Sequence, residues 1–244
     1  MANEGGVWIM RGPSWDDPKC IHTVDGAVEL IEKIGFLPLF KNGVDGFSLE
    51  EYTAPEFWWS GDAEKDPWEW REIIAREGKV AYGKFFDKKA GFISTEWLSH
   101  FANCRRDGYD FDALWDDGKA QARAKKIMDL YAEDLSDSEY YSFELEKKAG
   151  FGKHGEKGFD GVLTALQMQI YLCVSDFRQR RNKIGEPYGW PIAVYATPEH
   201  LWGYESVTSA YSVSPSESAT KIAEHMRGLF PDADGRKIRK ICGV

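Results

Sequence analysis

Apolar and polar positions along the chain predict helices separated by two β-hairpins. A run with helical spacing covers residues 24–34, and Thr23 and Gly35 are the cap residues at its two ends. The same reasoning predicts further helices at 67–77, 95–104, 111–134, 138–149, 158–168 and 215–227, with short helical turns after Ser48 and Thr197. Helices mixed with short hairpins exclude a parallel doubly wound sheet, so the pattern predicts a mostly helical α+β fold with short antiparallel hairpins.

The two hairpins have different connections. Strand-like residues 79–86 and 90–94 flank a short turn, whereas 169–177 and 188–196 flank the longer polar stretch 178–187. From residue 138 to 196 the predicted order is helix, glycine loop, helix, strand, loop, strand. That order is typical of a winged helix, in which a recognition helix, here Phe159–Met168, precedes a hairpin wing.

The expected organisation is a single compact unit over residues 1–244, built from tandem winged-helix-like modules. Its possible sub-modules are a winged-helix-like segment at 20–104, a helical connector at 105–149, and a second winged-helix-like segment at 150–244. The last of these would carry the basic wing.

Charge suggests a partner for the wing. Its predicted tip carries four cations that suit phosphate contacts, namely Arg178, Arg180, Arg181 and Lys183. The net charge of −9 argues against a protein that coats nucleic acid non-specifically, but residues 1–77 alone account for it, with 16 acidic and 7 basic side chains. An acidic body with one cationic face is therefore possible. A solvated, charged loop is the alternative reading of the same residues.

Tryptophan is abundant, with ten residues in the chain. An aromatic core is one explanation, and a cleft that stacks flat ligands is the other. The candidates for such a cleft are Trp58, Trp59, Trp68, Trp70 and Trp97. Glu69 lies on the same short helix as two of them, and aromatic platforms beside carboxylates suit sugars or nucleobases.

The sequence lacks the motifs of metal-binding, dinucleotide-binding and membrane proteins. The four cysteines and five histidines are scattered, so we expect free thiols and no metal site. The glycine-rich stretch 150–155 follows a charged helical end rather than a buried strand, so we expect no dinucleotide cofactor. Neither an apolar run of membrane-spanning length nor signal-peptide features occur, so we expect a cytoplasmic protein without membrane contact.

Six sequence blocks together resemble the bacterial AlkZ-related proteins, distant kin of the AlkZ/YcaQ DNA glycosylases. The blocks are GFSLEE (46–51), DPWEWR (66–71), YGKFF (82–86), KAGFIS (89–94), LQMQ (166–169) and YGW (188–190). The resemblance runs from about residue 20 to 230. It implies tandem winged-helix modules around a central channel that accepts DNA.

The resemblance also implies where catalytic residues would lie. In the glycosylases a Gln-aliphatic-Gln or Gln-aliphatic-Asp pair follows the first helix and positions the water that cleaves the glycosidic bond. The matching stretch here, residues 34–40 (IGFLPLF), contains neither glutamine nor carboxylate. A Gln-Met-Gln occurs instead at 167–169, so the weak catalytic candidates are Gln167, Gln169 and Glu69.

Three functions remain open at this point. The leading hypothesis is a winged-helix protein that binds nucleic acid, DNA above all, through the basic hairpin and without proven catalysis. The second is an N-glycosidic hydrolase of the DNA-glycosylase type, acting on damaged bases. The third is a protein-interaction module on the same scaffold, which the acidic N-terminal third of the chain favours.

Overall fold

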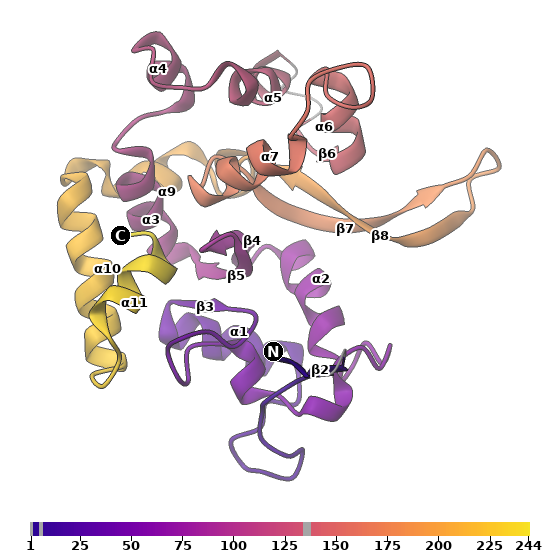
Figure 1. Cartoon of the computed structure of the whole chain (residues 1–244), viewed down its shortest axis with the longest axis vertical. Coiled ribbons are helices and arrows are strands. Elements are labelled where there is room, and N and C mark those ends of the chain that lie inside the picture. The colour runs from indigo at the N-terminus through magenta and orange to yellow at the C-terminus, as the bar shows by residue number, and fades with distance from the viewer. Residues whose placement is uncertain (1, 5–6, 134–137) are drawn as a thin grey trace.

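A computed structural model of the chain describes residues 2–4, 7–133 and 138–244 (Figure 1). Within these residues the central element is a six-stranded sheet in the order β3–β5–β4–β7–β8–β6. Each neighbouring pair in it is antiparallel, and a separate ribbon pairs β1 with β2. The strands are β1 (Ala2–Glu4), β2 (Val7–Ile9), β3 (Phe36–Pro38), β4 (Val80–Phe86), β5 (Lys89–Ser94), β6 (Tyr140–Tyr141), β7 (Cys173–Arg181) and β8 (Pro187–Ala196).

Helices surround this sheet and complete the predicted α+β fold. They are α1 (Val24–Ile34), α2 (Pro67–Glu77), α3 (Thr95–Arg106), α4 (Phe111–Asp116), α5 (Ala122–Glu133), α6 (Ser142–Lys148), α7 (Phe159–Met168), α8 (Pro198–Trp202), α9 (Tyr204–Thr208), α10 (Pro215–Leu229) and α11 (Gly235–Cys242). Short 3₁₀ turns lie at Leu49–Tyr52, Pro55–Phe57 and Ser209–Ser212.

The predicted helix caps are confirmed where local chemistry specifies them. The side chain of Thr23 accepts the backbone N–H of Gly26 at 3.1 Å, and Asp66 accepts that of Trp68 at 2.8 Å. Gly78 ends α2 in the left-handed conformation that glycine adopts at little cost. The predicted helix at 111–134 is wrong as one element, because the chain turns at Gly118 (φ 67°) and separates α4 from α5.

The second hairpin differs from its prediction at both ends. Gln169 ends α7 and Ile170 takes a positive φ of 62°, so β7 starts only at Cys173. The predicted polar loop 178–187 is largely strand, with Arg178 opposite Ile192 and Arg181 opposite Pro187. Hydrophobic alternation could not reveal this extension, because residues 178–190 are exposed on both faces.

The two halves of the sheet are built in a similar order, with one α-helix between the first two strands of the first half and two between those of the second. In the first, α1, β3, α2, β4 and β5 follow one another, and β3 pairs with β5. In the second, α5, β6, α6, α7, β7 and β8 do so, and β6 pairs with β8. The halves join where Tyr82 of β4 faces Val174 of β7. The segment 105–149 thus contributes two helices, α5 and α6, and the edge strand β6 to the second half.

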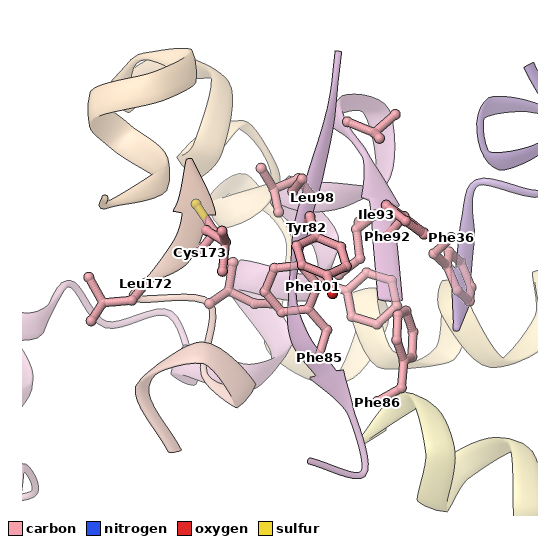
Figure 2. Close-up of a cluster of buried hydrophobic side chains, with 14 of the residues drawn as sticks. Phe36, Tyr82, Phe85, Phe86, Phe92, Ile93, Leu98, Phe101, Leu172 and Cys173 are labelled. Atoms are coloured by element: carbon pink, nitrogen blue, oxygen red, sulfur yellow. The ribbon is translucent and has the colours of Figure 1, made fainter. Parts of the chain in front are cut away.

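One aromatic-rich core occupies the junction (Figure 2). Phe101 of α3 packs edge-on against Phe36 of β3, with ring centroids 4.8 Å apart, and against Phe86 of β4 at 6.3 Å. From the other half, Leu172 and Cys173 enter the same buried cluster. Because the core is continuous across the β4–β7 pairing, it positions the base of the β7–β8 hairpin relative to α2.

Candidate functional site

The β7–β8 hairpin extends well beyond the body of the molecule (Figure 1). Its inner half is buried in the sheet, whereas residues 178–190 are exposed. The connecting turn is ordered by Asn182, whose side-chain oxygen accepts the backbone N–H groups of Ile184 and Glu186, each at 3.0 Å. The hairpin is therefore a structured arm with a solvated outer half.

Arg178 lies at the base of this arm and is held by carboxylates on two sides. Its Nε donates to Asp176 Oδ2 at 2.7 Å, and its Nη2 lies 2.5 Å from Glu139 Oε2. Arg76 of α2 reaches the other oxygen of Asp176 at 2.9 Å. Burial raises the pKa of Asp176, but the hydrogen bonds from Arg178 and Arg76 outweigh burial and hold that pKa below its ordinary value. Arg178 thus helps to anchor the arm.

The remaining three cations lie farther out. The Arg180 guanidinium is 4.6 Å from the Phe143 ring centroid, and Arg181 Nη1 donates to the carbonyl oxygen of Gly185 at 2.7 Å. Lys183 is exposed in the turn. Neither of these two arginine contacts involves a carboxylate, and no ion pair is formed by Lys183 among the described residues, so the positive charge of all three side chains is not neutralised by an ion pair.

An aromatic residue outside the predicted cleft stands out on the same arm. Trp190 of β8 is 89% exposed, which is unusual for so large an apolar side chain. The alternation of Tyr188, Trp190 and Ile192 in the sequence resembles the buried face of a strand. Only the length of the hairpin, which carries these positions away from the core, shows that Trp190 faces solvent.

A groove of about 680 Å³ separates the arm from α2. Trp68 and Trp190 contribute its aromatic surface, and Glu69 and Glu72 contribute its carboxylates. Its full lining is Gly61, Trp68, Glu69, Arg71 and Glu72 on the α2 side, with Gln179, Gly189, Trp190 and Pro191 on the hairpin. The pairing of β4 with β7 brings these segments together across more than a hundred residues of sequence.

Arg71 and Glu72 are buried at the α2 wall of the groove, whereas Glu69 is partly exposed. The Arg71 guanidinium lies between two aromatic rings, 3.7 Å from the Trp68 centroid and 4.2 Å from that of Phe177. Its Nη2 pairs with Glu72 Oε1 at 2.9 Å, and the two side chains are 7% and 10% exposed. Burial raises the pKa of Glu72, against the opposing effect of Arg71.

The five predicted cleft tryptophans lie in two environments. Trp58, Trp70 and Trp97 are buried in the core, where the indole N–H of Trp58 donates to Thr53 Oγ1 at 3.1 Å. Trp59 is partly exposed and packs against Trp68, with ring centroids 6.2 Å apart. Trp68 lines the groove.

A comparison with known protein families found a match over almost the whole chain. The family model described as "AlkZ related" matches residues 21–243, which include α2, the groove and the whole β7–β8 hairpin. The chain belongs to the AlkZ-related family. No match was found among curated proteins, and none among solved structures.

In this AlkZ-related protein, the catalytic candidates from the sequence lie in three different surroundings. Gln167 is 1% exposed, and its side chain accepts the backbone N–H of Lys84 at 3.0 Å and donates to the Leu163 carbonyl at 3.2 Å. Gln169 lines a separate cavity of about 450 Å³ between α4–α5 and α7. Glu69 lies in the groove. The geometry does not bring the Gln-Met-Gln side chains to one site.

Other ligand chemistry is limited in the part of the chain that the structure describes. Within residues 2–4, 7–133 and 138–244, no three His, Cys, Asp or Glu side chains converge as metal ligands do. All four cysteines are free, and burial raises the pKa of Cys104 to about 11. Every helix in the described ranges is too short or too polar to cross a bilayer.

Proposed function

We propose that this AlkZ-related protein binds nucleic acid with the β7–β8 hairpin as a wing. The outer hairpin carries the proposal, because it presents three exposed cations and Trp190 on one structured arm. Arg180, Arg181 and Lys183 would contact phosphates, and the indole of Trp190 would stack on a base or sugar at the edge of the groove. Membership of the AlkZ-related family supports this function.

We further propose that both halves are winged-helix modules. The order of elements and the pairing of the first strand with the last in each half support this assignment. In the second half α7 takes the position of a recognition helix. Its exposed residues include Asp160, Gly161 and Ala165 but no cation, so phosphate contacts must come from other elements.

Fluorescence anisotropy with labelled duplex DNA over a salt series tests the wing. We expect Arg180→Gln, Arg181→Gln and Lys183→Gln together to reduce the slope of log K against log salt by about 0.9 per lost phosphate contact. Arg178 is kept, because changing it would loosen the hairpin base.

Two controls make this test specific. A variant with three other exposed lysines replaced, Lys147→Gln, Lys153→Gln and Lys157→Gln, changes the net charge equally and should keep the slope. Trp190→Ala should weaken binding by about 1–3 kcal/mol, the value of one stacked base, with the slope unchanged. A wild type that binds no DNA at low salt, or a wing variant that binds as well as the wild type, would refute the wing function.

The position and raised pKa of Glu72 favour a second candidate function, the hydrolysis of an N-glycosidic bond in the groove. A carboxyl group with a raised pKa, in a groove that Trp68 and Trp190 also line, suits protonation of a departing base. Glu69 lines the same groove, but its side chain is less buried. We therefore expect any base release from alkylated DNA to be abolished by Glu72→Gln and retained by Glu69→Gln. A fully inactive wild type would remove this candidate.

A further inference from the structure

A second basic surface lies at the C-terminal helix, far from the hairpin along the chain. The eight residues of α11 bury Ile238, Ile241 and Cys242 against the body. Its exposed side carries four cations and no acidic residue, and these cations are Arg236, Lys237, Arg239 and Lys240. Residues three apart share a helix face, so Lys237 and Lys240 form one row and Arg236 and Arg239 form a second.

The β4–β5 turn extends this charge. A cavity of about 240 Å³ separates the turn from α11, and Lys89, Lys237 and Lys240 line it. Asp87 is the acidic residue in its lining, and its carboxylate is 3.5 Å from Lys240 Nζ. The apolar residues Pro38, Phe40, Phe86 and Ile241 also line the cavity. The cavity is therefore a concave site with an excess of positive charge.

Asp45, Asp232 and Asp234 line a cavity beside Lys237, and two of these three carboxylates also have other partners. Asp45, at the Lys237 end, pairs with Lys41 at 2.9 Å. Asp234 accepts the backbone N–H of Arg236 as the N-cap of α11. Asp232 borders a neighbouring cavity that Lys237 also lines. The four helix cations thus face solvent with Asp87 as their one side-chain ion-pair partner among the described residues.

We propose that α11 and the β4–β5 turn form a second contact surface for the phosphates of a nucleic acid, which we call the basic α11 surface. This inference rests on the proposed nucleic-acid binding and extends it to an element outside the hairpin. In a chain of net charge −9, a cluster of this kind would provide local attraction for a polyanion that the rest of the protein repels.

The burial of α11 favours nucleic acid over a membrane. A helix that binds a bilayer inserts its apolar face between lipids. Here Ile238 and Ile241 are 1% and 9% exposed, so that face already packs against the protein. What remains outside is two short rows of exposed cations on a helix that is fixed to the protein, and these suit contacts with phosphates along a strand.

The basic α11 surface can be altered independently of the hairpin. In Figure 1 α11 lies beside α10 on the left, whereas the hairpin projects to the right. The test variant carries Arg236→Gln, Lys237→Gln, Arg239→Gln and Lys240→Gln, because glutamine keeps the helix propensity and removes the charge. The matched control replaces four other lysines, Lys19, Lys33, Lys65 and Lys79, with glutamine and so lowers the net charge equally.

Anisotropy of labelled duplex DNA is measured across a salt series for the wild type, both variants and the hairpin variant. We expect the α11 variant to lose roughly tenfold in affinity at about 0.1 M salt, and up to about 3.6 units of salt slope for four contacts. The control should bind as the wild type does. Circular dichroism and thermal unfolding check that the α11 variant keeps its fold.

The outcomes separate this inference from the wing function. Loss in the α11 variant alone supports the basic α11 surface and overturns the wing. Loss in the hairpin variant alone overturns the basic α11 surface and keeps the wing, and loss in both supports both. Equal losses in the α11 variant and its control would reduce the effect to net charge and overturn the inference. Binding to phosphatidylserine vesicles but not to DNA would also overturn it.

Discussion

Arg106 joins α3 to α8 and to the segment between α7 and β7, and its replacement should cost a large part of the stability. It ends α3, and its side chain is 1% exposed. Its Nη1 lies 2.5 Å from Glu199 Oε1 of α8, and its Nη2 donates to the Ile170 carbonyl at 2.5 Å. The guanidinium also lies 4.6 Å from the Tyr171 ring centroid. One side chain of α3 thus holds two segments that lie more than sixty residues away in the sequence.

The expected loss of stability follows from the two groups that Arg106→Met leaves without a partner. Methionine fills similar space but donates no hydrogen bond, so the carboxylate of Glu199 and the buried carbonyl of Ile170 both lose their partner. Breaking a buried ion pair by removing one partner costs about 3–5 kcal/mol. Glu199 is 26% exposed and regains some water, so we expect about 3 kcal/mol.

The strain at Ile170 makes the effect smaller rather than larger. A β-branched residue with φ of 62° is held there by its surroundings, and such a conformation costs about 1–3 kcal/mol. Without Arg106 the segment between α7 and β7 can relax, and the strain that it releases offsets part of the lost contacts. For a chain of this size, about 3 kcal/mol corresponds to a fall in Tm of roughly 6–12 °C.

Urea and thermal unfolding, followed by circular dichroism, measure this change. The control is Arg227→Met on the exposed side of α10, which should leave Tm almost unchanged. A cycle with Glu199→Gln should show a coupling of more than about 1 kcal/mol. A loss below about 1 kcal/mol for Arg106→Met would show that the guanidinium does not hold α3, α8 and the segment before β7 together.

Three further predictions concern the site and its support. Asp176→Asn should lower the free energy of unfolding by about 1–2 kcal/mol at neutral pH. Because the pKa of Asp176 is depressed, this difference in stability between wild type and variant is full above the ordinary aspartate pKa. It should vanish in an acid titration as the pH falls through the depressed value. Gly91→Ala should cost about 1–3 kcal/mol in urea unfolding, since its Cβ would lie 2.5 Å from Phe86 Cδ2 and 2.7 Å from the Leu37 carbonyl. Gln167→Ala should cost about 1–3 kcal/mol by leaving the Lys84 N–H unpaired, and its DNA salt slope should equal that of the wild type.

The predicted catalytic and binding residues show how much of the site could be predicted from the sequence. The cations of the second hairpin are visible as a charge run, but their surroundings are not. Arg178 looks equivalent to Arg181 in sequence. It nevertheless lies between Asp176 and Glu139, and only the fold brings Glu139 to it. Trp190 and Glu72 were missed as site residues because alternation and local charge say nothing about which segment lies opposite.

Local chemistry determined the elements and several of their ends. Thr23, Asp66 and Ser214 act on backbone N–H groups two or three residues away, so their caps need no tertiary contact to be recognised. The two hairpins and the α+β class follow from similarly short-range patterns. The repeated order of elements in the two halves was not apparent as a sequence repeat, because packing constrains the order and pairing of elements more than their residues.

The tertiary structure decided the rest. The groove exists because β4 pairs with β7 and carries α2 to the hairpin, although the residues at its two walls are separated by more than a hundred positions. Burial of the Arg71–Glu72 pair depends on that same pairing, and exposure of Trp190 depends on the length of the hairpin. These are long-range effects of sheet order and solvent exclusion, and a pattern within one segment contains no information about them.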